Sequence, residues 1–149
     1  MSHLVFVYGS LKRGFGNHDV LGGSPLIAKT RTVGRCFNMI SLGAFPAVLN
    51  SGEYDIEGEL YEVDDYTLEA LDMLEGEGYL YRRQKVGLAS GHTAWLYFLI
   101  WNLSTDAPQE RVKVTRNHSQ TWLPRTFGLS YILGREPLQK GKSGSVFKK

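Results

Sequence analysis

One carboxylate, that of Glu75, is the most informative chemical group in this sequence. On a predicted helix, Leu68, Leu71 and Glu75 are spaced i, i+3 and i+7, so all three project from one face. Glu75 also falls in the last turn, where the helix dipole disfavours negative charge. Burial and the dipole together predict a raised pKa, suited to proton transfer near neutral pH. Periodicity alone leaves open that Glu75 turns to solvent at a frayed end, or pairs with Arg82 or Arg83.

A second feature that could bind a charged group is the junction Tyr8-Gly9-Ser10-Leu11-Lys12, where a predicted strand runs into a glycine-containing loop. A strand that ends in this way releases several backbone N–H groups, which can form a concave anion site. From the residues alone, a simple turn is the favoured interpretation.

Motifs for other chemistries are incomplete. A dinucleotide fingerprint fails because Asp19 stands where its third glycine is required. Ser10 lacks the flanking glycines of a nucleophile elbow. The four histidines are scattered without metal-ligand spacing. We therefore expect no metal and no cofactor.

Composition places these features in one globular domain spanning residues 1–149. The 42% hydrophobic and 21% charged content of this 149-residue chain is ordinary for a globular protein. The net charge is +2, but residues 134–149 hold five basic side chains against one acid, so the rest of the chain is slightly acidic. This distribution argues against a nucleic-acid-binding body and predicts a flexible basic tail from about residue 138.

The sequence also bears on location. The longest apolar run, residues 94–101, is far shorter than the ~20 residues of a membrane-spanning helix. The first residues lack the pattern of a signal peptide, and a single cysteine, Cys36, suits a reducing compartment. We expect a cytoplasmic protein that does not bind membranes.

The elements that must position the two features are mainly short strands. A half-exposed strand over 55–63 leads into a helix over about 67–75, with Asp64 or Asp65 as N-cap and Gly76 as a left-handed C-terminal residue. Strands are also expected over residues 4–8, irregularly within 26–49 with breaks at Gly34, Gly43 and Pro46, and over 79–88 and 93–102. Beyond residue 102 the pattern is weak. This order predicts an α+β fold with a small closed or curled sheet.

The two features combine into a family resemblance. The run VFVYGSLKRG at residues 5–14, followed by Asn17-His18, closely resembles the start of gamma-glutamylamine cyclotransferases, within the gamma-glutamylcyclotransferase-like family. Later segments also resemble that family: GELYEVD at 58–64, LDMLEG at 71–76 and YRR at 81–83. The resemblance runs in order over about residues 4–101 and ends beyond Asn102.

The resemblance implies a small mixed β-barrel with a few flanking short helices and a cavity at its mouth. It implies that Glu75 is the catalytic acid/base and that the substrate-binding residues are Tyr8, Gly9, Ser10, Leu11, Tyr81 and Tyr97. The implied reaction is intramolecular attack of the α-amine on a gamma-glutamyl amide, which releases 5-oxoproline and a free amine. The implied partner is therefore a small gamma-glutamyl molecule.

The leaving group stays open at this point. Lys-Arg-Gly at 12–14 with Asn17-His18 favours a gamma-glutamylamine such as gamma-glutamyl-ε-lysine. Gamma-glutamyl amino acids and glutathione are alternatives, and so is a non-catalytic module that binds a small molecule in the same cavity. Oligomeric state cannot be predicted from these residues.

Overall fold

The computed structural model describes residues 1–100 and 105–124, so the predicted basic tail lies outside the described residues. Its elements follow the chain in the order β1 (Ser2–Val7), η1 (His18–Leu21), β2 (Leu26–Arg31), β3 (Phe37–Ser41), β4 (Pro46–Asp64), α1 (Asp65–Glu75), β5 (Tyr81–Gly87), β6 (Thr93–Leu99), β7 (Val112–Val114) and β8 (Ser119–Trp122). The α+β class is confirmed. No helix among these residues has the length and apolar character needed to cross a membrane.

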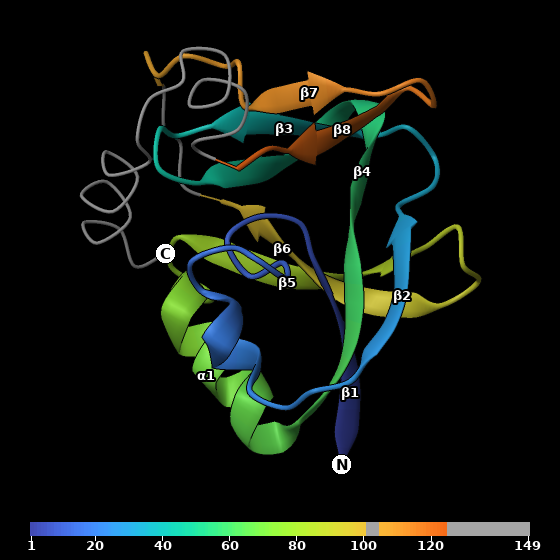
Figure 1. The fold of residues 1–149 in the computed structure, drawn as a ribbon, viewed down its shortest axis with the longest axis vertical. Helices are drawn as coiled ribbons and strands as arrows, with labels where there is room; N and C mark the ends of the chain where they lie inside the picture. The colour runs from blue at the N-terminus through green and yellow to red at the C-terminus, as the bar shows by residue number, and fades with distance from the viewer. Residues whose placement is uncertain (101–104, 125–149) are drawn as a thin grey trace.

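The long strand β4 organises the sheet (Figure 1). Its first part pairs with β3, and its second part lies between β1 and β2, antiparallel to all three. β6 joins the other side of β1 in parallel, and the β5–β6 hairpin completes that edge. The expected break at Pro46 is wrong because this proline is the first residue of β4, a position where a missing N–H is tolerated.

The sheet is mixed but not closed into a barrel. Its β2 edge meets the β5–β6 hairpin at one isolated bridge, Thr32 to Leu88, and the amide of Ala89 donates to the carbonyl of Arg31 beside it. Only the turn of the hairpin reaches β2, so no ladder forms between β2 and β5 within the described chain. The curled sheet expected from the sequence is present without the closure of a barrel.

Two apolar clusters fill the space around β4. Tyr61 and Val63 belong to one cluster, whereas Ile56 and Leu60 belong to the other. The prediction that this strand is half exposed is therefore wrong, because β4 is covered on both faces where it lies between β1 and β2. Gly58 is required at this crossing, since a Cβ there would lie 2.3 Å from the carbonyl oxygen of Val7.

The helix α1 agrees with the sequence prediction in its start, its end and its buried face. The carboxylate of Asp64 accepts a hydrogen bond from the amide of Thr67 at 2.7 Å, and this bond lowers the pKa of Asp64. Gly76 ends the helix in the left-handed conformation, at φ 61° and ψ 51°. α1 packs beside η1 and contacts β1 and β4 (Figure 1), which places its last turn near the end of β1.

Candidate active site

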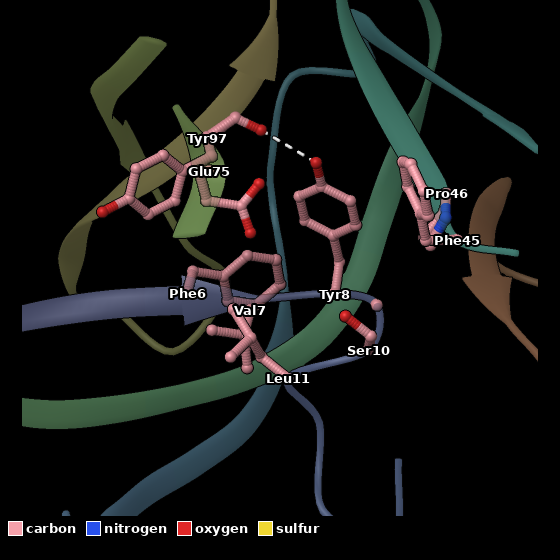
Figure 2. A pocket seen from close by; sticks show the side chains of 10 residues that line it. Phe6, Val7, Tyr8, Ser10, Leu11, Phe45, Pro46, Glu75 and Tyr97 are labelled. Carbon is pink, nitrogen blue, oxygen red and sulfur yellow. Dashed lines mark hydrogen bonds between the residues drawn. The ribbon is translucent and has the colours of Figure 1, made fainter. Parts of the chain in front are cut away.

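A pocket opens where β1 ends and the last turn of α1 passes beside it (Figure 2). It encloses about 360 Å³ when the open space at its mouth is included. The lining residues come from four parts of the chain: Phe6, Val7, Tyr8, Gly9, Ser10, Leu11, Phe45, Pro46, Glu75 and Tyr97. Six of the seven site residues expected from the sequence therefore meet here.

Glu75 is the carboxylate of this pocket. Its residue is only 8% exposed although it is the last residue of α1, so the frayed, solvent-facing alternative is wrong. Figure 2 shows its carboxylate directed between the side chains of Tyr97 and Tyr8. The ion pair of Arg83 goes to Asp72, one helical turn earlier. A carboxylate enclosed by mainly apolar and aromatic groups is the type of side chain that proton transfer requires.

The backbone carbonyls of the loop after β1 accept hydrogen bonds from within the protein, whereas the amides of residues 9, 10 and 11 stay available to a ligand. The carbonyls of Gly9, Ser10 and Leu11 accept bonds from the Lys12 amide, the Asn17 amide and the His18 Nδ1 at 3.0, 2.8 and 2.9 Å. Within the described chain, none of the amides of residues 9, 10 and 11 donates a hydrogen bond. N–H groups of pocket-lining residues that have no acceptor among the described residues can bind a carboxylate or an oxyanion.

Close packing fixes this loop against Pro46, the first residue of β4. A Cβ on Gly9 would lie 2.6 Å from the Pro46 Cγ, so only glycine allows this approach. The Asn17 Nδ2 also donates to the Ser10 hydroxyl oxygen at 3.0 Å, which leaves the Ser10 proton free to point elsewhere. The result is a loop with fixed geometry and unused donors, as an anion site needs.

Three tyrosines surround Glu75 and stay protonated. Burial raises the pKa of Tyr8, Tyr81 and Tyr97, and the charge of Glu75 raises each of them further. The Tyr8 hydroxyl donates to the carbonyl oxygen of Tyr97 at 2.8 Å (Figure 2). Tyr81 is buried, and the charge of Glu75 raises its pKa. It is not among the described residues that line the pocket. Its predicted contact with substrate stays a prediction.

Sequence reasoning gave no role to a charged pair that supports this arrangement. Asp72 accepts from the Tyr97 hydroxyl at 2.6 Å and from the Arg83 Nε and Nη2 at 2.8 and 3.1 Å. The guanidinium of Arg83 stacks over the Trp95 ring at 4.3 Å. Asp72 therefore connects the end of α1 to β5 and β6. The i, i+3 spacing of Asp72 and Glu75 was the available signal, but the partners are remote in sequence.

Phe45 and Pro46 are lining residues that the sequence did not indicate. They are apolar and lie far from the other lining residues along the chain, so no local pattern marks them. The described residues hold no group of three or more His, Cys, Asp or Glu side chains arranged to bind a metal ion.

A comparison with protein families identifies where this arrangement belongs. The family described as "Gamma-glutamyl cyclotransferase, AIG2-like" matches residues 5–123, which include every lining residue of the pocket. The chain belongs to this family. Both the loop after β1 and the end of α1 fall inside the matched range, so the pocket lies within the part of the chain that matches the family.

Curated relatives within the gamma-glutamyl cyclotransferase family agree over the same part of the chain. A Vibrio cholerae relative is 41% identical over 97 residues, covering 65% of this chain and 82% of its own. The gamma-glutamylcyclotransferase family protein YtfP of Escherichia coli is 33% identical over 93 residues, covering 62% of this chain and 79% of its own.

Solved structures share the fold. YkqA from Bacillus subtilis is similar with a TM-score of 0.56 and 32% identity, over 68% of this chain and 37% of that one. An AIG2-like protein from Mus musculus gives a TM-score of 0.64 at 24% identity, over 83% of this chain and 97% of that one. At that lower identity the second likeness concerns the fold alone.

Proposed function

We propose that this protein is a gamma-glutamyl cyclotransferase that acts on gamma-glutamylamines, with Glu75 as its acid/base. The observation that carries the proposal is a buried carboxylate in the same pocket as a loop whose three amides donate no hydrogen bond within the described residues. Membership in the gamma-glutamyl cyclotransferase family supports it independently.

The reaction needs proton transfer and a folded substrate. A gamma-glutamyl amide carries both the nucleophile, its α-amine, and the electrophile, its γ-carbonyl carbon. Glu75 takes a proton from the α-ammonium, and the freed amine forms a C–N bond to the γ-carbonyl carbon. The original amide C–N bond then breaks, and Glu75 returns the proton to the departing nitrogen. The second proton of the ring nitrogen passes to the freed amine, which leaves as an ammonium ion. The products are 5-oxoproline and the free amine, and the pocket accelerates the step by holding the substrate bent.

The loop amides and the tyrosines have complementary roles in this proposal. Amides of Gly9, Ser10 and Leu11 bind the α-carboxylate or the oxygen that becomes negative during ring closure. Tyr8 and Tyr97, kept protonated by their raised pKa values, shape the wall beside Glu75. None of the described residues that line the pocket is Lys or Arg, so among them backbone donors carry the recognition of negative charge.

The choice of a gamma-glutamylamine rests on the residues that follow the loop. Asn17 and His18, part of the stretch that resembles gamma-glutamylamine cyclotransferases, both brace the loop in the structure. Gamma-glutamyl amino acids and glutathione differ from gamma-glutamyl-ε-lysine only beyond the amide nitrogen. The glutamyl half therefore occupies the same pocket in each case, and the leaving group is decided at its mouth.

The test is release of 5-oxoproline, measured by mass spectrometry, from gamma-glutamyl-ε-lysine, gamma-glutamyl-alanine and glutathione in parallel. We expect turnover of the first substrate and a loss of at least about 100-fold in Glu75→Gln, since general acid–base catalysis contributes that much. Glu69→Gln, an exposed glutamate on the same helix, is the matched control and should retain wild-type turnover.

Each other result has a defined meaning. Wild-type activity in Glu75→Gln would refute the acid/base role. Preference for glutathione or gamma-glutamyl-alanine would keep the reaction and replace the substrate class. No release from any of the three, with folded protein, would favour the alternative in which the cavity only binds a small molecule.

A further inference from the structure

A second pocket lies on the β2–β4 surface and shares no lining residue with the pocket of Glu75. It encloses about 720 Å³, counted in the same way. Residues of β2 and β4 form one wall, and residues near β8 form another. Lys12, which directly follows the loop of the first pocket, also lines this second pocket. The proposed cyclotransferase reaction uses none of these groups.

Three cations line this second pocket without carboxylate partners. Lys29 and Arg31 stand on β2 directly opposite Glu59 and Glu57 of β4 in the antiparallel register. Such cross-strand pairs usually neutralise each other. Here, within the described parts of the chain, none of Lys12, Lys29 and Arg31 forms an ion pair with a carboxylate.

The two glutamates are engaged elsewhere. Glu57 accepts a hydrogen bond from the Thr115 hydroxyl at 2.9 Å. Glu59 is buried and accepts from the Arg13 amide and the Tyr61 hydroxyl, both at 2.8 Å. Burial and the bond to Glu59 raise the pKa of Tyr61 to about 12, so this phenol remains a donor. These bonds hold both carboxylates against β4 and the 115–119 turn, and among the described residues neither carboxylate forms an ion pair with the three cations.

Two of the cations, Lys12 and Arg31, have N–H donors without a hydrogen-bond acceptor among the described residues. Lys12 is only 8% exposed, and its ammonium donates to a single acceptor, the carbonyl oxygen of Trp122 at 3.0 Å. Burial lowers its pKa, and the charge of Lys29 lowers it further, against the opposing effect of the Glu59 and Glu57 charges. The Nε of Arg31 is buried and finds no acceptor among the described residues. A buried donor without a partner is costly, so a ligand that supplies acceptors would be bound.

We propose that this second pocket binds a compact oxyanion, the carboxylate or phosphate group of a small molecule, held by Arg31 and Lys29 with Lys12 behind them. Arginine binds both groups through paired N–H donors. The three cations exceed the two glutamates by one charge, which suits a single small anion. An extended polyanion such as nucleic acid would be repelled by the same glutamates.

Isothermal titration calorimetry at constant ionic strength, with chloride as the balancing anion, tests the proposal. Inorganic phosphate and acetate are the probes, titrated separately into the full chain. We expect saturable binding that weakens by about tenfold or more in Arg31→Gln, as loss of a charge-assisted hydrogen bond predicts. Lys29→Gln changes an exposed side chain, so its weakened binding would be independent of any folding defect. Arg82→Gln, an exposed cation on β5 outside the pocket, is the matched control.

The two probes separate the sources of the oxyanion. Tighter binding of phosphate would assign a phosphate-bearing ligand, and equal or tighter binding of acetate would assign a carboxylate. Absence of saturable binding of either probe, or equal binding by wild type, Arg31→Gln and Lys29→Gln, would overturn the proposal. Binding that is lost in Arg31→Gln and retained in Glu75→Gln would belong to the second pocket and not to the pocket of Glu75, so the result does not depend on the proposed reaction.

Discussion

Removal of the Asp72 carboxylate should loosen the end of α1 that carries Glu75. Asp72 accepts hydrogen bonds from Tyr97 on β6 and from Arg83 on β5, and its backbone carbonyl accepts from the amides of Gly76 and Glu77. Asp72→Ala keeps the backbone bonds and deletes the side-chain bonds. The variant therefore tests how α1 is attached to the sheet, with the helix cap left intact.

The structure allows the cost to be divided between the two partners. Tyr97 is 3% exposed, so water cannot easily replace the lost acceptor, and an unsatisfied buried hydroxyl costs about 1–3 kcal/mol. The Arg83 side chain is 22% exposed and can turn to solvent, so its share is about 0.5–1 kcal/mol. We expect Asp72→Ala to lower the free energy of unfolding by about 1.5–4 kcal/mol, more through Tyr97 than through Arg83.

Two double-mutant cycles measured by urea unfolding separate these shares. One combines Asp72→Ala with Tyr97→Phe, and the other combines it with Arg83→Gln. The coupling energy should be larger in the tyrosine cycle. Glu69→Ala, on the exposed face of the same helix, is the control and should change stability by less than about 0.5 kcal/mol. A tyrosine coupling below about 0.5 kcal/mol, or smaller than the arginine coupling, would refute the reasoning.

Two further predictions concern the loop after β1. Gly9→Ala should destabilise the fold by about 1–3 kcal/mol and reduce turnover, because the new Cβ overlaps Pro46; unchanged unfolding and kinetics would contradict the close approach. Tyr8→Phe should show a pH-dependent effect. The folded-state pKa of Tyr8 lies above its usual value of 10.0, so its stabilising contribution is present below pH 10 and is lost as pH rises toward that folded pKa. The wild-type advantage over Tyr8→Phe in urea unfolding should therefore be smaller at pH 10.5 than at pH 8.5, and a constant difference would argue against a raised pKa.

The helix and its carboxylate could be read from the sequence because their signals are local. The cap at Asp64, the spacing of Leu68, Leu71 and Glu75, and the glycine at position 76 all act within a few residues. The same holds for the strand that ends at the loop after β1, where backbone amides are released. A resemblance over residues 4–101 then joined the two features, and the structure brings them to one pocket.

Tertiary pairing decided that the sheet stays open, that β4 is covered on both faces, and that β7 and β8 form. β8 lies parallel to β4 and pairs with it only at Asp55 and Ile56, and β7 pairs with β8. Pairing between segments so distant along the chain leaves no period in the local sequence, and the short β7 and β8 carry little pattern of their own.

The supporting shell of the site depended on the fold in the same way. Asp72 becomes important only when β5 and β6 bring Arg83 and Tyr97 to it, and Phe45 reaches the pocket only because β3 and β4 turn the chain back. The cations Lys29 and Arg31 likewise become notable only because the fold places them opposite two glutamates of β4. The sequence determined by itself which local elements carry reactive groups, because capping, spacing and turn chemistry are short-range. Tertiary structure alone decided which groups meet, because burial and electrostatics depend on neighbours that are remote in the chain.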